Sequence, residues 1–512
     1  MRLFQNKNGN SSAFFFISRI GLFFICCSAS CSLGTEKPVW QVVTRPMFVE
    51  ALRPLAAHRA KEGFQPVISV EDIEAARAKG KTKPAYILLV GDYEAGQEEQ
   101  IWSVSSRKRR MYRWRSWQRE YFVSDMYWGD RDGDGVPEIP VGRLPVRTVK
   151  QLRGLIRKII AYEAHPMRRE DLSLPIWTGA PDFNPILDAL ITQLGWQVGQ
   201  VNAPPWANLW VIVANPTHRL CGRPEDQSAL FSRRMQEGGV LSAMVGHGGE
   251  DHFFSMRAPS RYIVYQADQA RRYLSPDKAS SPLAIIACYC GDFSGKTPCL
   301  AESLLLEPGG PPAVIAATTE SQPLTNFYSC ISLLKSLDGS PKRLGDLWLR
   351  SQKQMLQMRD ILLERLLRHV EGKLEEELDM AKVKRDQMLM YAILGDPALR
   401  LRWPGRLEAE IKQTKEGWQW RAKKPADAER LYVEFRDEIG MMPVRNQSLD
   451  PSLARQEFEK ANNQLRFKSL EEFNSRQKWA GICKQSGTLR LSAVGSTKIY
   501  VAAWHLANLL EN

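Results

Sequence analysis

Two short hydrophobic runs, each ending abruptly in glycine-rich polar residues, stand out in the pattern of hydrophobic and polar positions. Residues 240–245 are followed by Gly246-His247-Gly248-Gly249, and residues 283–287 by Cys288-Tyr289-Cys290-Gly291. Runs of this length between turn residues are typical of buried strands. The segment 262–274 contains no Pro or Gly and predicts a crossover helix. The two strands should therefore be parallel neighbours.

The chain up to about residue 403 alternates between short hydrophobic runs and helical patterns. Further strands are predicted at residues 41–43, 66–70, 85–90, 174–178, 313–317 and 399–401. Helices are predicted at residues 48–63, 71–79, 149–163, 185–194, 297–306 and 344–394, the last as one long core-facing helix. This alternation is typical of an α/β protein with a parallel sheet. Such sheets carry their chemistry beyond the carboxyl ends of the strands.

Beyond residue 404 the pattern changes to alternating polar and apolar positions. Runs near residues 418–420, 431–435, 489–493 and 499–503 predict strands that are exposed on one face. We therefore expect an N-terminal α/β subdomain at 38–168, a catalytic subdomain at 169–404 and a small β-rich domain at 405–512.

The first 31 residues have the composition of an export signal. They contain Arg2, Lys7 and Arg19, no acidic residue, and an apolar stretch at 13–27 that is followed by Ser28-Ala29-Ser30-Cys31. The last residues are similar to the end of a bacterial lipoprotein signal, in which Cys31 would be lipidated and attach the protein to a membrane. A buried N-terminal helix is the alternative. Removing the three cations lowers the net charge from +13 to +10.

The composition is that of a globular protein with several domains, since 44% of the 512 residues are hydrophobic and 25% are charged. One basic and aromatic cluster occurs at residues 107–117. It would suit nucleic acid, but an exported protein seldom meets nucleic acid, and a solvated or lipid-facing loop is favoured. Six cysteines outside the signal show neither disulfide-framework spacing nor paired metal-binding motifs.

A short acidic loop carries four carboxylates, Asp130, Asp132, Asp134 and Glu138. Alternating carboxylates followed by glycine can fold around a hard cation, and the sequence predicts Ca²⁺ here. The twelfth position is Val141, so this is not a standard EF-hand loop. An acidic surface turn is the alternative. No other cofactor is expected.

A thiol and an imidazole at the same sheet edge suggest nucleophilic catalysis. An imidazole such as that of His247 can take the proton of a cysteine and later give it to a leaving amine. The amides of Gly248 and Cys288 could hold the oxyanion, and Asp182 could orient the histidine if its loop reaches the same edge. An inert core cysteine and a structural histidine are the alternatives, and His252 lies close enough to be confused with His247.

His-Gly after one hydrophobic run and Ala-Cys after the next resemble the signature of the caspase-like cysteine peptidases. Within that clan the chain is most similar to the gingipain family over about residues 40–403. The similar motifs are Gly246-His-Gly-Gly-Glu250, Ala287-Cys-Tyr-Cys-Gly-Asp-Phe293, Pro298-Cys-Leu-Ala-Glu302, Val314-Ile-Ala-Ala-Thr318, Leu394-Gly-Asp-Pro397, Tyr86-Ile-Leu-Leu-Val-Gly-Asp92 and Val141-Gly-Arg143.

The resemblance implies a two-subdomain α/β fold followed by an immunoglobulin-like domain. It also implies Cys288, not Cys290, as nucleophile and His247 as its base, acting on protein or peptide substrates. Gingipains use a pocket acid to select Arg or Lys, and Asp182 or Asp188 could fill that role here. Pro323 stands where the family has a pocket tryptophan, so the P1 specificity is left open. A non-catalytic adhesion protein and a cell-surface transpeptidase are the alternatives.

Overall fold

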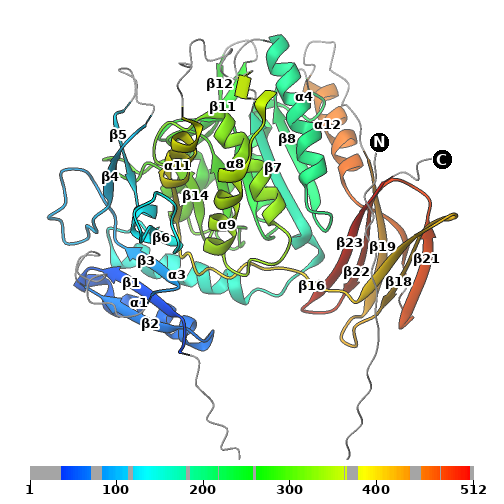
Figure 1. Ribbon diagram of the computed structural model, residues 1–512, viewed down its shortest axis with the longest axis horizontal. Coiled ribbons are helices and arrows are strands. Elements are labelled where there is room, and N and C mark those ends of the chain that lie inside the picture. The colour runs from blue at the N-terminus through cyan, green and yellow to red at the C-terminus, as the bar shows by residue number, and fades with distance from the viewer. Residues whose placement is uncertain are drawn as a thin grey trace, which may run out of the picture. The chain divides into compact units, whose positions relative to one another are not determined.

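A ten-stranded sheet forms the centre of the computed structural model (Figure 1). The structure describes residues 36–70, 83–112, 119–179, 185–216, 218–257, 261–362, 364–365, 379–438, 451–472, 474 and 476–507. Residues 38–512 belong to one compact unit, separate from residues 1–37. The predicted export signal, with Cys31, and the predicted helix at 71–79 lie outside the described residues. The predicted domain boundaries at 168/169 and 404/405 stay predictions.

The sheet has two halves of opposite strand direction, in the order β2-β1-β3-β6-β15-β14-β13-β9-β7-β8. One half contains β1 (Val39–Thr44), β2 (Gln65–Ser69), β3 (Tyr86–Val90) and β6 (Val141–Leu144). The other contains β7 (Ser173–Gly179), β8 (Asn208–Ala214), β9 (Ser242–Val245), β13 (Leu283–Ile286) and β14 (Val314–Ala317). Strand β15 (Tyr391–Leu394) joins them, since it is parallel to β6 and antiparallel to β14. The prediction of a mostly parallel α/β sheet is confirmed.

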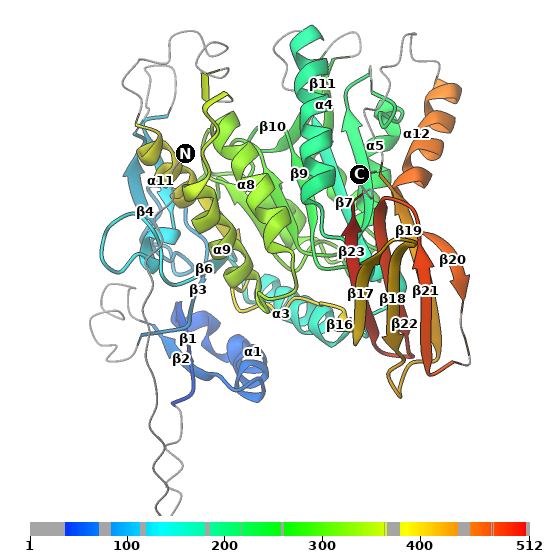
Figure 2. The same cartoon turned by 45° about the vertical axis from the view of Figure 1, so that its right-hand side comes forward.

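Helices cover both faces of the sheet, which gives three layers (Figure 2). One layer contains α1 (Val49–Lys61), α3 (Val149–Ala164), α5 (Pro224–Met235) and α7 (Leu300–Leu306). The opposite layer contains α4 (Pro185–Asn202), α8 (Pro323–Ser336), α9 (Leu344–Gln357) and α11 (Met380–Met390). Helix α3 shows how the sequence specifies these elements. A capping box of Thr148 and Gln151 starts it, and Leu152, Leu155, Ile156 and Ile159 bury its apolar stripe.

The predicted crossover helix at 262–274 is wrong. The chain forms a three-stranded antiparallel sheet of β10 (His247–Gly248), β11 (His252–Arg257) and β12 (Arg261–Gln266). Only the short helices η4 (Ala267–Gln269) and α6 (Ala270–Tyr273) follow. The β-branched and aromatic residues at 262–265 favour a strand, and β11 provides the partner. Strands β9 and β13 are nevertheless parallel neighbours, as predicted.

The long helix predicted at 344–394 is also wrong. Helix α9 ends at Gln357, and the chain continues into α11 and then into strand β15. The four residues of β15 are all buried, because the sheet surrounds them on both sides. Met355 is buried as predicted, but the side chain of Leu362 is 77% exposed. Residues 366–378 of the predicted helix lie outside the described residues.

Two smaller predictions also differ from the structure. Residues 399–401 form no strand, and an isolated bridge between Arg343 and Arg400 takes its place. The basic cluster begins as a strand rather than a loop, since β4 (Arg107–Arg110) pairs with β5 (Tyr121–Ser124). Its cations have partners, with Arg109 3.6 Å from Asp386 and Arg110 2.9 Å from Glu120.

Two sheets form the C-terminal region, and their inner faces share one apolar core; all their strand pairs are antiparallel except β16 with β23, which is parallel. One sheet contains β16 (Gly405–Arg406), β19 (Arg430–Asp437), β20 (Lys468–Glu472), β22 (Gly487–Val494) and β23 (Ile499–Leu506). The other contains β17 (Ala409–Thr414), β18 (Gly417–Lys423) and β21 (Lys478–Cys483). The β-rich prediction is therefore confirmed.

An additional helix, α12 (Pro451–Leu465), connects β19 to β20 and was not predicted. It packs against β8, the edge strand of the ten-stranded sheet. The Asn462 side chain accepts a hydrogen bond from the Val211 amide and donates one to the Val211 carbonyl, both at 3.2 Å. One side-chain amide therefore pairs with the backbone of an edge strand as another strand would.

Buried ion pairs stabilise the half of the sheet that contains β1, β3 and β6. The Arg59 guanidinium of α1 donates to Asp396 at 2.9 Å and to Glu163 of α3 at 2.9 Å. Asp396 also accepts from the indole N–H of Trp40 at 3.1 Å. Arg143 of β6 donates to both carboxylate oxygens of Asp125, at 2.6 and 2.8 Å. The Leu394-Gly-Asp-Pro397 and Val141-Gly-Arg143 motifs are therefore parts of the scaffold.

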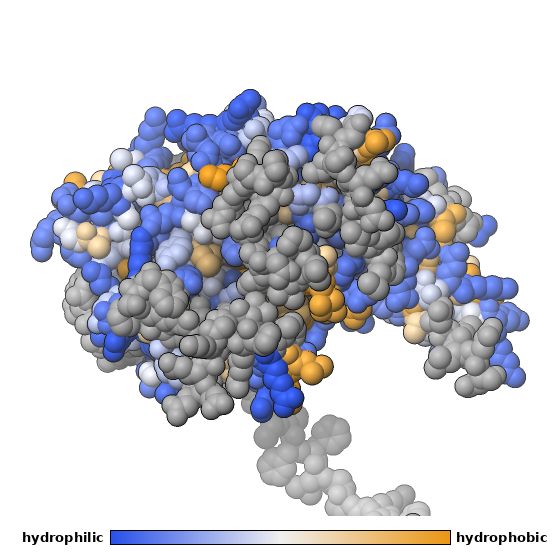
Figure 3. All heavy atoms as spheres, turned by 90° about the horizontal axis from the view of Figure 1, so that it is seen from above, coloured by the Kyte–Doolittle hydropathy of each residue, from blue (hydrophilic) through white to orange (hydrophobic). Residues whose placement is uncertain are grey.

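The visible surface is mostly polar. Figure 3 shows a face on which hydrophilic residues dominate and the described hydrophobic residues form small separate groups. None of the helices in the described part of the chain has the length and apolarity that a membrane span requires.

Candidate active site

His247 and Cys288 follow two neighbouring parallel strands at the same edge of the sheet. Val245 of β9 pairs with Ile286 of β13, and the Gly246 amide donates to the Ile286 carbonyl at 3.1 Å. Each of the two residues lies two positions beyond that last pair. The strand register therefore brings these two residues to one edge of the sheet.

Gly248 lies directly against the cysteine turn. A Cβ atom at this position would lie 2.6 Å from the Cys288 carbonyl oxygen and would also overlap the Cys290 sulfur. Only glycine allows the backbone after His247 to approach this closely. The His-Gly pair thus reflects a contact between two loops that lie 40 residues apart in the sequence.

The turn at Cys288 is strained. Tyr289 has a φ of +58°, and among the described residues it is the one non-glycine residue with positive φ. The Cys290 amide donates to the Cys288 carbonyl at 2.7 Å, which closes a three-residue γ-turn around Tyr289. The Tyr289 amide donates to the Thr319 carbonyl at 3.0 Å. Strain of this kind persists only where neighbouring contacts impose it, and it is frequent at functional sites.

Exposure separates Cys288 from the other thiols of this region. Cys288 is partly exposed, whereas Cys290 and Cys299 are buried. Burial raises the pKa of the Cys290 thiol far above its ordinary value, so that thiol stays protonated. The Cys290 sulfur instead contacts the His252 carbonyl oxygen at 3.6 Å. The six described cysteines outside the predicted signal form no disulfide.

Ser321, beyond the end of β14, contacts the Cys288 sulfur. Its amide N–H donates to the sulfur at 3.4 Å, and its carbonyl and hydroxyl oxygens lie 3.6 Å away. A donor aimed at the sulfur favours the thiolate over the thiol. No sequence motif marks Ser321, although the rule that strands deliver residues to their carboxyl edge applies to β14 as well.

A buried polar network fixes the position of Ser321. The Asn326 amide donates to the Ser321 hydroxyl at 2.7 Å. The Asn326 side-chain oxygen accepts from Gln387 at 2.7 Å and from the Tyr391 hydroxyl at 2.8 Å. Helices α8 and α11 and strand β15 therefore meet beneath the thiol.

The pairing of β10 with β11 leaves the Gly248 amide unused by that hairpin. The Gly249 amide donates to the His252 carbonyl at 2.8 Å, and the next pair is Gly248 with Phe253. Hydrogen-bonded and non-hydrogen-bonded pairs alternate in antiparallel ladders, so the Gly248 N–H points away from β11. His252 itself has its Nδ1 atom 2.7 Å from the Asp251 carboxylate.

Arg119 connects the loops that follow the histidine and the cysteine. Its guanidinium donates to Glu250 and to Asp292, and it lies over the Tyr289 ring at 5.4 Å from the centroid. Burial lowers its pKa, but the charges of Asp292 and Glu250 outweigh this, and its pKa is raised. Arg119 therefore stays a cation and holds both loops.

A buried carboxyl group lies at the start of α7, behind the cysteine turn. Glu302 accepts a hydrogen bond from the Cys299 amide at 2.9 Å, which caps the helix. Burial, followed by the charge of Asp92, raises the pKa of Glu302 to about 8. Asp92 is itself buried and has a raised pKa, and it pairs with Arg147 at 2.6 Å.

We expect Glu302→Gln to change how stability depends on pH. The folded pKa of Glu302 lies above its ordinary value of 4.5, so the folded state binds this proton more tightly than the unfolded state does. The resulting stabilisation is complete below pH 4.5 and is lost as the pH rises towards about 8, by at most about 1.4 kcal/mol per unit. The difference in melting temperature between Glu302→Gln and wild type should therefore increase in favour of the variant over this range. The exposed Glu50→Gln should show a constant difference.

The four carboxylates of the acidic loop converge. One carboxylate oxygen from each of Asp130, Asp132, Asp134 and Glu138 could bind a metal ion, and these four oxygens lie within 4.8 Å of one another. Backbone amides of the loop also donate to them, for example that of Gly135 to Asp130 at 2.9 Å. Hard oxygen ligands at this spacing fit Ca²⁺.

The residues predicted to orient the histidine or select the substrate are only partly described. Asp182 lies outside the described residues. Asp188 lies in the first turn of α4, and Pro323 is an exposed residue in the first turn of α8, two residues after Ser321.

Fold and site together define a class of protein, the caspase-like cysteine peptidases. The sequence model of peptidase family C25 matches residues 35–402. The chain therefore belongs to peptidase family C25, the gingipain family of cysteine peptidases, and acts on protein or peptide substrates. No curated protein sequence matches the chain.

Solved structures share the fold at low sequence identity. The crystal structure of the Arg-specific cysteine proteinase gingipain R is 14% identical, with a TM-score of 0.51, and the match covers 93% of this chain and 99% of that one. The complex of Porphyromonas gingivalis RgpB pro- and mature domains is 14% identical, with a TM-score of 0.50 and coverage of 92% and 100%. A structure titled only as a protease is 13% identical, with a TM-score of 0.53 and coverage of 92% and 98%.

Proposed function

We propose that the protein is an endopeptidase that cleaves peptide bonds with Cys288 as nucleophile and His247 as its base. The shared strand register, which delivers both residues to one sheet edge, carries the proposal. His247 takes the thiol proton as the sulfur attacks the scissile carbonyl carbon. It then gives this proton to the leaving amine when the C–N bond breaks. Water hydrolyses the acyl-enzyme by the same sequence and restores the thiol.

Two further features support these roles. The Ser321 amide donates to the sulfur and stabilises the negative charge that develops there as His247 takes the proton. The Gly248 amide, which the hairpin does not use, and the Cys288 amide are the proposed oxyanion donors. Fixed backbone donors act strongly on a developing oxyanion, because they need no reorganisation as the charge forms.

Two experiments test the proposal. Limited treatment with iodoacetamide followed by peptide mass mapping should label Cys288 far faster than Cys290, Cys299 or Cys330. A peptide library that varies P1 should then report turnover and the preferred residue, with Cys288→Ala as the inactive control. Uniformly slow labelling together with no turnover would instead favour a non-catalytic binding protein.

The P1 residue depends on a region that differs from the family pattern. Gingipain R is described as Arg-specific. Here Pro323 is exposed two residues after Ser321, which contacts the Cys288 sulfur, and Asp188 is the described candidate for a pocket acid. We propose that Asp188→Asn changes turnover of Arg and Lys substrates selectively if the pocket is acidic, and the same library measures this.

We also propose that residues 1–31 export the protein to the cell envelope, with Cys31 as the lipid attachment site. The composition of this segment supports export. Fractionation of cells that express the wild type and Cys31→Ser tests both parts. Release of the variant from the membrane fraction supports lipidation, and an unprocessed cytoplasmic product contradicts export.

Replacing Arg119 by Ala is expected to lower kcat/KM by about 10- to 100-fold, mainly through kcat. The loops after His247 and Cys288 would lose the cation that connects Glu250 and Asp292. Steady-state kinetics on the best library peptide measure the effect, and Arg119→Lys should restore part of it. Arg110→Ala, which removes an exposed cation from the same hairpin, is the control and should change neither parameter.

Calcium at the acidic loop is a separate proposal. Four converging carboxylates repel one another without a cation, so removal of bound Ca²⁺ should destabilise this loop. Chelation with EGTA is expected to lower the melting temperature, and added Ca²⁺ should restore it. A double variant, Asp132→Asn with Asp134→Asn, should no longer respond to EGTA. An unchanged melting temperature of the wild type on chelation would contradict the proposal.

A further inference from the structure

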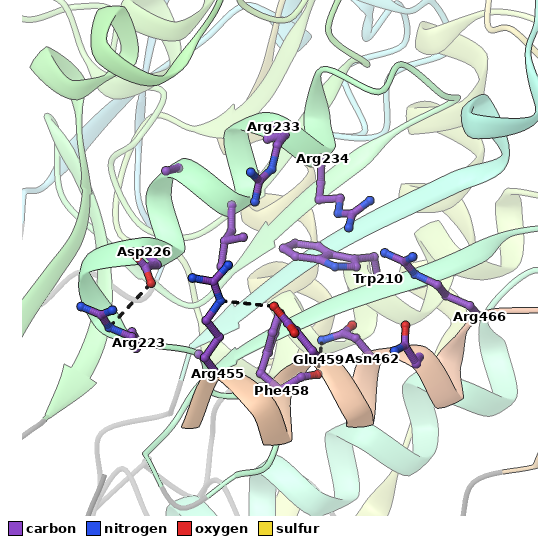
Figure 4. A pocket seen from close by; sticks show the side chains of 14 residues that line it. Trp210, Arg223, Asp226, Arg233, Arg234, Arg455, Phe458, Glu459, Asn462 and Arg466 are labelled. Atoms are coloured by element: carbon purple, nitrogen blue, oxygen red, sulfur yellow. Dashed lines mark hydrogen bonds and ion pairs between the residues drawn. The ribbon is translucent and has the colours of Figure 1, made fainter. Parts of the chain in front are cut away.

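A cavity of about 490 Å³ lies between α5 and α12, away from the cysteine and the histidine (Figure 4). Its floor contains the buried side chains of Trp210 on edge strand β8 and of Phe458 and Asn462 on α12. Cavities of this size accommodate small organic molecules. Trp210 and Phe458 also pack edge to face, with their ring centroids 5.8 Å apart. The floor of the cavity is therefore a fixed aromatic surface.

Positive charge dominates the walls of this cavity. Five arginines line it, against two carboxylates, Asp226 and Glu459; the arginines are Arg223, Arg233, Arg234, Arg455 and Arg466. They come from both sides, and Figure 4 shows several of their guanidinium groups around the Trp210 ring. The side chains that line the cavity carry an excess of three formal positive charges, and Glu225 and Glu237, which pair with Arg223 and Arg234, reduce this excess to one.

Only some of these arginines form ion pairs with carboxylates. Arg223 pairs with Glu225 at 2.5 Å, Arg455 pairs with Glu459 at 3.2 Å, and Arg234 pairs with Glu237. In the described part of the chain no carboxylate forms an ion pair with Arg233 or Arg466. Two cations on opposite walls are therefore available to a ligand.

The hydrogen-bonding capacity of Arg234 is not filled within the cavity. Its guanidinium lies over the Trp210 ring at 5.3 Å from the centroid, and its buried Nε has no hydrogen-bond partner. Burial lowers the pKa of Arg234, and the positive charge of Arg466 lowers it further, against the effect of Glu237. An anion between the two walls would relieve this repulsion.

We infer that this cavity binds an organic phosphate, a phosphate group attached to an apolar or aromatic part. Guanidinium groups that approach one point from several directions suit the tetrahedral oxygens of phosphate, whereas one planar carboxylate is satisfied by one Arg fork. Trp210 and Phe458 provide the surface for the apolar part. The phosphate belongs either to a soluble ester or to the head group of a lipid.

Calorimetric titration of the full chain with phenyl phosphate tests the inference. Binding is expected, tighter than that of inorganic phosphate, because the ring contacts the aromatic floor. It should weaken as salt is added. The double variant Arg233→Ala with Arg466→Ala should bind at least about tenfold more weakly, equivalent to about 1.4 kcal/mol. Arg153→Ala with Arg157→Ala, which removes two exposed cations from α3, should bind like the wild type.

Sedimentation with vesicles distinguishes the two sources of the phosphate. Cosedimentation with phosphatidylcholine vesicles only when they contain phosphatidic acid, and only with Arg233 and Arg466 present, indicates a lipid head group. Binding of phenyl phosphate without cosedimentation indicates a soluble ester. The inference is overturned if phenyl phosphate does not bind, if benzoate binds equally well, or if both double variants lose the same affinity. Melting temperature and peptidase activity should be unchanged in both variants, which confirms that they are folded.

Discussion

Replacing Cys288 by Ala should lower kcat/KM for the best peptide by at least about 10³-fold. Without the sulfur no acyl-enzyme forms, and the oxyanion donors and the binding groups leave only residual catalysis. The fold should survive, because Cys288 is partly exposed and the neighbouring thiol of Cys290 fills the core beside Gly248. Steady-state kinetics and melting temperature, measured on the same preparation, separate loss of chemistry from loss of structure.

Cys290→Ala is the matched control for this change. It removes a thiol two residues away that is buried and held protonated. Its kcat should stay within a few fold of wild type, although the lost packing lowers the melting temperature. Loss of activity in Cys290→Ala with activity retained in Cys288→Ala would reverse the assignment of the nucleophile. His247→Ala should resemble Cys288→Ala, whereas His252→Ala should not.

Replacing Arg59 by Ala should reduce the free energy of unfolding by about 3–5 kcal/mol. The side chain of Arg59 is fully buried, and its removal leaves Asp396 and Glu163 buried without their counter-charge. The hydrogen bond from His58 and the charge of Arg59 hold the pKa of Glu163 at about 2 against the opposing effect of burial. Both carboxylates would then have to take up protons or attract water.

Urea denaturation followed by tryptophan fluorescence measures this loss, with several probes to detect intermediates in a chain of this length. Arg53→Ala on the same helix is the control. Its side chain is 74% exposed and pairs only with Glu50, so its effect should lie within about 1 kcal/mol. Equal midpoints for the two variants would show that the buried ion pairs of Arg59 do not stabilise the fold.

The sheet edge that carries the proposed site could be predicted from the sequence, because the residues that mark it are neighbours in the chain. Each hydrophobic run is short, and each ends at once in glycine beside a reactive side chain. The rule that parallel strands deliver residues to one edge then brought Cys288 and His247 together. The same rule applied to residues 313–317 would have found Ser321.

The elements that were missed depend on distant partners. Residues 391–394 continue a helical pattern of Met and Leu, and they become a strand only because β14 and β6 pair with them. The hairpin β11–β12 formed where a helix was expected, since the absence of Pro and Gly does not distinguish the two. Arg59 and Asp396 lie 337 positions apart, and neither residue by itself indicates a buried ion pair. Helix α12 lies within a β-rich part of the sequence, but it packs against β8 of the ten-stranded sheet, which is distant in the sequence.

The contact of Asn462 with Val211 has a consequence for how this protein can be shortened. An open strand edge is adhesive, and the side chain that closes this one comes from the C-terminal region. A chain cut at residue 404 would keep every residue of the proposed chemistry. It would also expose the unpaired backbone N–H and C=O groups of β8, to which other molecules of the same chain could bind. The C-terminal region thus covers, through α12, a strand edge that would otherwise be open to pairing.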